Sequence, residues 1–192
     1  MLEFDPSDHS YRLDGKLIPG VTTVLGAVGI IETSYFREEA AWRGSVMHKV
    51  CELDDLGTIA QYEIDPQAEP YLAAYRAFKR DRAFLPSLIE QPLADPKLGF
   101  AGTPDRTGVI AGRQRGLDYR VTLDLKTGAE AWWHRLQLAA YSQLTGTLGR
   151  IVLRLKSDGT YNAHELPIAD RWRDKDDFLR CLYVYNLREE NR

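Results

Sequence analysis

The chain has 192 residues, of which 44% are hydrophobic and 28% are charged, and its formal net charge is −3. These values are ordinary for a soluble globular protein, and we expect residues 1–192 to form a single domain with a substantial core. The net charge provides no global positive field that would indicate a nucleic-acid partner, but a protein that gathers carboxylates around a metal can still carry a local basic groove.

The cysteines and the N-terminus argue against several classes of protein. Cys51 and Cys181 lie far apart and belong to no C-x-x-C pair, so neither a disulfide framework nor a structural zinc site is expected. The N-terminus lacks a basic segment followed by an apolar one, and no apolar run approaches the ~20 residues of a membrane span. We therefore expect a cytoplasmic protein with no membrane contact.

The first quarter of the chain predicts a hairpin and two helices. Residues 10–18 suit a short hairpin that turns at Asp14 and Gly15, and a helix is expected to begin near Val21, after Pro19. Residues 33–56 predict a long helix, or two joined ones, with a core-facing stripe at helical spacing. The stripe consists of Val46, Val50 and Leu53.

His48 lies on this second helix, four residues after Gly44 and four before Glu52. A lone helical histidine is most often a surface or hydrogen-bonded core residue. However, Gly44 lets a ligand or another backbone approach the same helix face closely. Together with the carboxylates farther along the chain, this favours a metal-ligand role for His48, whereas Glu52 is expected to be solvated or to support the site indirectly.

Residues 64–83 predict a third helix with an aromatic stripe and a basic cluster. The spacing of Tyr71, Tyr75 and Phe78 favours core positions over a base-stacking surface. The basic cluster fits either a solvated helix face or a strip that follows a phosphate backbone. It comprises Arg76, Lys79, Arg80 and Arg82.

Residues 86–94 predict a strand on which Glu90 is exposed or directed at a metal site, with exposure the usual outcome. Two further strands, one through residues 102–105 and one through 119–126, flank a polar loop at 111–118. Pairing these strands symmetrically sets Asp105 opposite Asp124, with Cβ atoms about 4.5–5.5 Å apart. Two carboxylates that close repel unless a cation separates them or one is protonated. Lys126 points to the same strand face as Asp124.

The remaining chain predicts a helix, a hairpin and a terminal helix. Residues 131–144 suit an amphipathic helix whose polar face could overhang the carboxylates; that face contains His134, Gln137 and Tyr141. Residues 149–166 suit a hairpin, and residues 169–191 a helix. The element order predicts a mixed α/β domain with a central sheet flanked by helices.

Pro104-Asp105 followed by Asp124-Leu125-Lys126 resembles the signature of the PD-(D/E)XK nuclease superfamily in its D-x-K form. Two more elements match its RecB-like and phage-exonuclease branch. These elements are the Q-x-x-x-Y pair Gln137 and Tyr141, and the G-x-x-x-H pair Gly44 and His48.

This resemblance implies a restriction-endonuclease-like core and a metal-dependent DNA nuclease, most often an exonuclease, in DNA processing, recombination or repair. It implies Mg²⁺ or Mn²⁺ as cofactor, because these ions suit an oxygen-rich site. Some relatives hold an iron–sulfur cluster with four cysteines, which this chain lacks. The implied partners are DNA and a single-strand annealing or recombination protein, in a bacterial or phage-infected host cell.

The resemblance also implies roles for individual residues. Asp105, Asp124 and Lys126 are the expected catalytic residues. The expected metal ligands are His48, Asp105, Asp124 and the carbonyl of Leu125. Gln137 and Tyr141 are expected to brace the site and touch the substrate backbone, and Arg43, on the helix that leads to His48, is a candidate substrate-binding cation.

Two other functions remain open from the sequence. The first is a catalytically inactive nucleic-acid-binding module on a nuclease fold, although such a module would usually lack one of the acids or the lysine. The second is an unrelated enzyme acting on small phosphate esters, which no glycine-rich phosphate loop or histidine-rich cluster supports.

Overall fold

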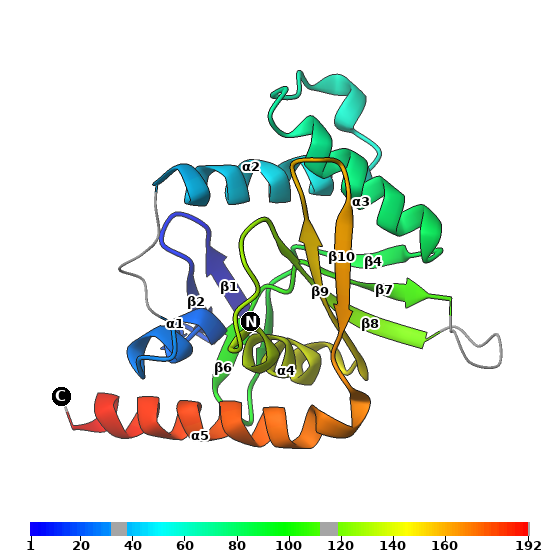
Figure 1. The fold of residues 1–192 in the computed structure, drawn as a ribbon. Coiled ribbons are helices and arrows are strands. Elements are labelled where there is room, and N and C mark those ends of the chain that lie inside the picture. Colours follow the sequence, from blue (N-terminus) through cyan, green and yellow to red (C-terminus); the bar gives the residue numbers. More distant parts are fainter. Residues whose placement is uncertain (32–37, 112–118, 192) are drawn as a thin grey trace.

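A mixed sheet with helices on both faces forms the centre of the fold (Figure 1). The computed structural model describes residues 1–31, 38–111 and 119–191. The strands are β1 (Leu2–Asp5), β2 (Ser10–Leu13), β3 (Lys16–Ile18), β4 (Leu85–Ile89), β5 (Leu93–Asp95), β6 (Phe100–Gly102), β7 (Arg106–Ile110), β8 (Tyr119–Lys126), β9 (Gly149–Leu155) and β10 (Tyr161–Glu165). The helices are α1 (Val21–Ala27), α2 (Glu38–Asp55), α3 (Glu69–Asp81), α4 (His134–Thr145) and α5 (Arg171–Glu190), with 3-10 turns at Ile59–Gln61 and Ile168–Asp170.

The central sheet has the strand order β10-β9-β8-β7-β4. Strands β8 and β9 are parallel, because α4 carries the chain back between them, and the other neighbours are antiparallel. This topology confirms the predicted α/β class with a mixed sheet flanked by helices. Within the described part of the chain, no helix has the length and apolarity needed to cross a bilayer.

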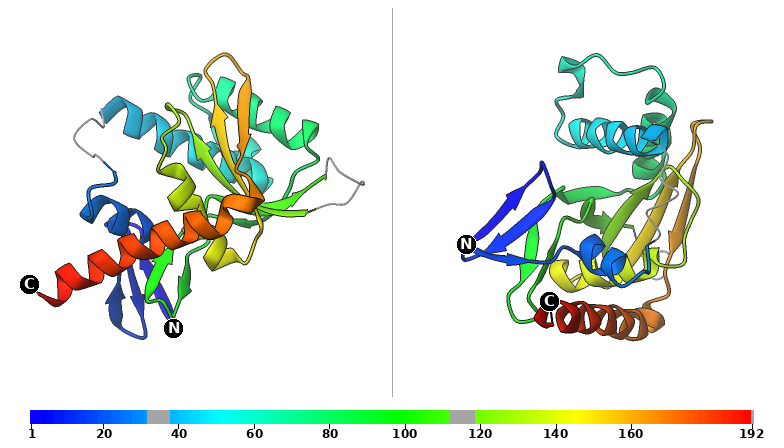
Figure 2. Two further views of the ribbon diagram at one scale, coloured as in Figure 1. Left: turned by 60° about the horizontal axis from the view of Figure 1, so that its bottom comes forward. Right: turned by 90° about the vertical axis from the view of Figure 1, so that its left-hand side faces the viewer.

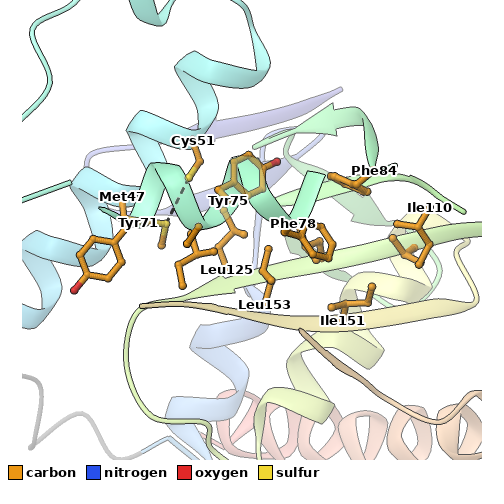
Figure 3. Close-up of a cluster of buried hydrophobic side chains, with 14 residues drawn as sticks. Met47, Cys51, Tyr71, Tyr75, Phe78, Phe84, Ile110, Leu125, Ile151 and Leu153 are labelled. Atoms are coloured by element: carbon orange, nitrogen blue, oxygen red, sulfur yellow. Dashed lines mark hydrogen bonds between the residues drawn. The ribbon is translucent and has the colours of Figure 1, made fainter. Parts of the chain in front are cut away.

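The hydrophobic core on one face of the sheet joins β8 and β9 to α2 and α3 (Figure 3). Val121, Leu123 and Leu125 alternate along β8, and all three are fully buried in this core. Tyr75 and Phe78 of α3 pack in the same core, so the aromatic stripe is a core element, as its spacing predicts. Thr122 and Asp124, which lie between these three residues, are also fully buried, but they face the opposite side of the sheet, where α4 lies.

Helix α4 is buried on nearly all sides. The sheet covers one side of it, and α1 and α5 cover others, as the layers in Figure 1 show. The polar face expected to overhang the carboxylates, His134, Gln137 and Tyr141, is buried. Asp124 acts electrostatically on both His134 and Tyr141, so this face lies near the carboxylates. Its burial depends on the packing of α5 against α4, a long-range contact that the helical pattern does not encode.

The N-terminal hairpin of β2 and β3 forms as predicted, with positive φ at Asp14 and Gly15, and β1 extends it to a three-stranded sheet. This small sheet lies beside the β5-β6 pair (Figure 2). The Ala101 N–H donates to the Pro19 carbonyl at 2.9 Å, and Tyr11 Oη lies 2.9 Å from Thr103 Oγ1. The N-terminal sheet therefore contacts the segment that leads into Asp105.

Two predicted strands differ from the structure. The strand expected over residues 86–94 is divided into β4 and β5, because the chain turns at Glu90, which has φ +46°, and Pro92 follows. The strand expected through residues 102–105 ends at Gly102, and β7 starts only at Arg106. The predicted helix start at 33–37 and the loop at 112–118 lie outside the described residues.

An ion-pair cluster links α5 to α4 and to strand β9 of the sheet. Asp174 is 1% exposed and accepts hydrogen bonds from Arg150 Nη1 at 2.8 Å and from Arg135 Nη1 at 2.6 Å. Burial alone would raise the pKa of this carboxyl, but the two guanidinium groups outweigh burial and hold the pKa below its usual value. A carboxyl with a lowered folded-state pKa stabilises the fold above its unfolded pKa of about 3.9, and the stabilisation is lost as the pH falls through the folded pKa.

Replacing Asp174 by asparagine is therefore expected to lower the free energy of unfolding at neutral pH, and by progressively less as the pH falls below about 4. Urea unfolding of both proteins across this range measures the difference. Asp176→Asn, at an exposed position on the same helix, is the control and should have little effect. An equal loss at neutral and acid pH would contradict the role given to the Asp174 carboxylate.

Candidate active site

Acidic and basic side chains from separate elements meet beside the end of β8. His48 comes from α2, Glu90 from the turn after β4, and Asp105 from the residue before β7. Ligand atoms of these three residues all lie within 4.8 Å of one another. His48 Nδ1 is 3.3 Å from Glu90 Oε1 and 3.6 Å from Asp105 Oδ1. The predicted proximity of His48 and Asp105 is thus present in the structure.

The charge state of His48 follows from these neighbours. Burial opposes a charged imidazole, but Asp105 and Glu90 outweigh burial and raise the pKa of His48 to about 9. At neutral pH, His48 is therefore a cation between two carboxyl groups. Because a metal ligand must be deprotonated, binding of a divalent ion here would displace this proton.

Asp105 is fixed directly against β8. The last β7-β8 pair is Arg106 with Leu123, and one further step in the same register sets Asp105 opposite Asp124. Asp105 Oδ2 accepts a hydrogen bond from the Leu125 N–H at 2.5 Å. Burial raises the pKa of Asp105, although His48 opposes this effect. The side chain of Leu125 lies in the core, so only the backbone of this residue is available to the site.

Asp124 and Lys126 form a buried pair next to this group. Lys126 Nζ donates to Asp124 Oδ1 at 2.9 Å, and it lies 2.8 Å from Oδ2 without the geometry of a hydrogen bond. Among the described residues, Asp124 Oδ2 has no hydrogen-bond partner. Burial raises the pKa of Asp124; burial opposes charge on Lys126, but Asp124 and Asp105 raise the pKa of Lys126, which stays an ammonium.

These residues fit a divalent cation. The carboxylate oxygens and one imidazole are ligands that Mg²⁺ or Mn²⁺ accepts. Asp124 Oδ2 offers a further buried oxygen: it has no hydrogen bond among the described residues but lies 2.8 Å from the Lys126 ammonium. Asp124 is not one of the three residues whose ligand atoms approach within 4.8 Å. A cation bound here would relieve the repulsion among the carboxylates.

Glu90 and Arg106 complete the group around His48 and Asp105. The sequence left Glu90 either exposed or directed at a metal site; in the structure it contacts His48 and accepts a hydrogen bond from Arg106 Nη1 at 2.9 Å. Arg106 was not identified from the sequence. Arg106 is fully buried, and it also donates to Asp55 Oδ2 at 2.6 Å and to the Asp105 carbonyl at 2.5 Å. An arginine directly after Asp105 in a strand of small and apolar residues was the available signal for this network.

The buried face of α4 closes the site from one side. Gln137 Nε2 donates to Tyr141 Oη at 3.2 Å, and Gln137 Oε1 has no partner among the described residues. Burial raises the pKa of Tyr141 well above its usual value, with Asp105 and Asp124 adding to the effect. The Tyr141 ring packs so closely on Gly102 that a Cβ there would lie 2.8 Å from Tyr141 Cε1.

His134, at the start of α4, is neutral. Its Nδ1 accepts the Ala131 N–H at 3.2 Å, so the ring proton lies on Nε2. Burial and the charge of Lys126 lower the pKa of His134 to about 4. The side chain thus offers one N–H donor near Lys126.

A cavity of about 850 Å³ opens beside these residues. Arg43 lies at its wall, and the Arg43 Nε has no hydrogen-bond partner in the described part of the chain. The other lining residues are Thr22, Thr23, Gly26, Ile31, Gly44, Met47, His48, Leu125, Lys126, Thr127, Gly128, Ala129, Ala131, Trp133, His134 and Gln137. Arg43, His48, Lys126 and Gln137 therefore share one cavity, as their predicted roles require.

The basic cluster near α3 is held by carboxylates. Arg76 and Lys79 pair with Asp54, both at 2.6 Å. Lys79 also pairs with Asp55, Arg80 pairs with Asp81, and Arg82 pairs with Glu165. None of the four cations lines the cavity. Of the two interpretations of this cluster, a free phosphate-binding strip finds no support in the structure.

Comparisons with known proteins concern the fold. No protein-family model and no curated protein sequence matches the chain. A candidate exonuclease from Eubacterium rectale superposes with a TM-score of 0.50 and 13% identity, over 86% of this chain and 71% of its own. The alkaline exonuclease LHK-Exo from Laribacter hongkongensis superposes with a TM-score of 0.41 and 15% identity, over 90% of this chain and 92% of its own. The chain therefore has a fold like that of the Eubacterium rectale protein.

Proposed function

We propose that this protein is a divalent-metal-dependent DNA nuclease, and specifically an exonuclease that hydrolyses phosphodiester bonds in DNA processing, recombination or repair. The observation that carries the proposal is the convergence of His48, Glu90 and Asp105 beside the buried Asp124-Lys126 pair. The exonuclease-like fold supports the same reaction class.

Asp105, Asp124, His48 and the backbone carbonyl of Leu125 are the proposed metal ligands, and Glu90 joins them as a further carboxylate. A bound Mg²⁺ or Mn²⁺ would lower the pKa of a coordinated water and polarise a phosphoryl oxygen. The protein's part is to keep the carboxylates close together. It does so through the Leu125 N–H on Asp105 and the Arg106 guanidinium on Glu90.

Lys126 is proposed to act as a hydrogen-bond donor and not as a base. Its pKa is raised by Asp124 and Asp105, so the proton stays on Nζ at neutral pH. A fixed ammonium beside the metal ligands would stabilise the negative charge that develops on the phosphoryl oxygens in the transition state. The neutral imidazole of His134 offers a second donor near Lys126.

Gln137, Tyr141 and Arg43 are the proposed substrate contacts. Of these, Arg43 is the cation: it lines the cavity and has an unpartnered Nε. Each phosphate that a protein neutralises contributes about 0.9 to the logarithmic salt slope on duplex DNA and about 0.7 on single strands.

Arg43→Gln is therefore expected to weaken DNA binding and to reduce the salt slope by the share of about one phosphate. Binding is measured in Ca²⁺, which occupies oxygen sites, across a range of salt concentrations. Arg76→Gln is the matched control, because its charge is already paired with Asp54, and it should leave the slope nearly unchanged. A larger change in DNA affinity and salt slope for Arg76→Gln than for Arg43→Gln would indicate that DNA binds along α3 instead.

The decisive test of the proposed function is cleavage. End-labelled linear, end-blocked linear, circular and single-stranded DNA are incubated with Mg²⁺, Mn²⁺ or EDTA. Metal-dependent degradation of DNA with free ends, lost in Asp105→Asn, is the expected result. Binding without cleavage would instead favour an inactive nucleic-acid-binding module. Turnover of a small aryl phosphate ester alone would favour an unrelated phosphoesterase.

A further inference from the structure

A second, smaller cavity lies at the other end of α4 from the active site. Its volume is about 310 Å³, and it is enclosed by the last turns of α4, the start of β9 and the first turns of α5. His134, the first residue of α4, lines the active-site cavity, whereas Ser142 and Gly146 at the far end line the second one. On α4, Gln137 is the last residue at the active-site cavity and Ala139 the first at the second cavity, so the two cavities lie on successive stretches of the helix.

Three cationic side chains contribute to the wall of this second cavity. Arg150, Arg171 and Lys175 all line it. Arg171 and Lys175 form no ion pair within the described ranges 1–31, 38–111 and 119–191. The nearby acid Asp174 is occupied by Arg150 and Arg135. Asp95 accepts a hydrogen bond from Gln143, another lining residue, and interacts electrostatically with Lys175. It therefore balances part of the positive charge and leaves an excess of cations at the cavity.

The buried Arg150 distinguishes this cavity from an exposed basic surface. The residue is 1% exposed, and its Nη1 and Nη2 donate to Asp174 and to the Pro167 carbonyl. Arg150 Nε and Ser142 Oγ, from two residues that line the cavity, are buried and have no hydrogen-bond partner among the described residues. Buried donors without acceptors are unfavourable, so an acceptor at this wall would be stabilising.

The Trp172 ring contacts the cationic groups of both Arg171 and Lys175. Arg171 Cζ lies 4.7 Å and Lys175 Nζ 5.7 Å from the centre of its ring. Such cation–π contacts restrict where the guanidinium and ammonium groups lie. The Trp172 side chain itself remains largely exposed, at 59%. The indole therefore also provides a fluorescent reporter at the cavity.

We propose that this cavity is a binding site for a phosphate group, held by Arg171 and Lys175 with support from Arg150 and Ser142. Guanidinium and ammonium groups with neighbouring hydroxyls are the donors that recognise phosphate oxygens. The cavity volume is at the lower end of the range for small-ligand pockets, enough for a phosphate and an attached sugar. The phosphate belongs either to a free nucleotide or to the backbone of a strand whose end occupies the active site. The free-nucleotide source is independent of the proposed nuclease reaction, whereas the strand source rests on it.

The test is a binding titration in EDTA, so that no metal-dependent cleavage contributes. Inorganic phosphate, dAMP, adenosine and single-stranded oligonucleotides of increasing length are added while tryptophan fluorescence is followed, with calorimetry as a second readout. We expect saturable binding of phosphate-bearing ligands, no binding of adenosine, and at least a tenfold loss of affinity in the double variant Arg171→Gln/Lys175→Gln. Trp172→Phe should lose the fluorescence change.

Arg180→Gln is the control, because Arg180 is an exposed cation of the same helix outside the cavity, paired with Asp177. Thermal unfolding checks that each variant is folded. Binding of dAMP or phosphate identifies a free nucleotide as the source. Binding of only those oligonucleotides long enough to span both cavities identifies a backbone phosphate. Absence of binding for every phosphate-bearing ligand, or an equal loss in Arg180→Gln, overturns the proposal.

Discussion

Lys126→Ala is expected to reduce the rate of DNA cleavage by roughly two to three orders of magnitude, the usual loss when a donor to developing charge is removed. The ammonium is fixed by Asp124 at 2.9 Å and kept protonated by the two aspartates. Its contribution is made in the transition state, so DNA affinity measured in Ca²⁺ should change little. Single-turnover cleavage in Mn²⁺ is the appropriate measurement.

The same substitution gives a second expectation for metal binding. Lys126 provides the ion pair that offsets the buried charge of Asp124. Without the ammonium, Asp124 attracts a cation more strongly, so metal affinity should stay constant or rise. Lys49→Ala is the control, since Lys49 is an exposed lysine paired with Glu52. Near-normal cleavage by Lys126→Ala would show that Asp124-Leu125-Lys126 is not a catalytic D-x-K motif.

The parts of the fold that were predicted from sequence depend on local patterns. The β2-β3 hairpin follows from the turn at Asp14 and Gly15, and α5 follows from helical spacing. The register that sets Asp105 against Asp124 also follows from the sequence, because symmetric pairing across a short loop leaves few alternatives.

The parts that were missed depend on contacts between distant segments. Arg76 is paired with Asp54, which is 22 residues earlier in the chain. No helical or strand period reveals such a partner. The sequence therefore could not decide whether the basic cluster of α3 is a solvated helix face or a phosphate-binding strip. Glu90 was left with two alternatives, exposed or directed at a metal site, for a related reason. Its contact with His48 spans 42 residues and depends on the turn between β4 and β5.

Arg106 is the residue whose loss should affect stability most. Its side chain is 0% exposed and bridges Asp55 at the end of α2, Glu90 after β4 and the Asp105 carbonyl. Removing one partner of a buried ion pair typically costs about 3–5 kcal/mol, because a charge is left in a poorly hydrated environment. Arg106→Met is therefore expected to lower the free energy of unfolding by about that amount, out of the roughly 5–15 kcal/mol typical of a domain.

The size of this loss depends on Asp55. Its carboxylate is also 0% exposed, and without Arg106 its remaining partners among the described residues are the Tyr75 hydroxyl and Lys79. Urea unfolding of Arg106→Met, Asp55→Asn and the double variant measures their coupling, and the double variant should be less destabilised than the sum of the single variants. Arg80→Met, an exposed arginine paired with its neighbour Asp81, is the control. Strict additivity would show that Arg106 stabilises the protein by packing and not by balancing a buried charge.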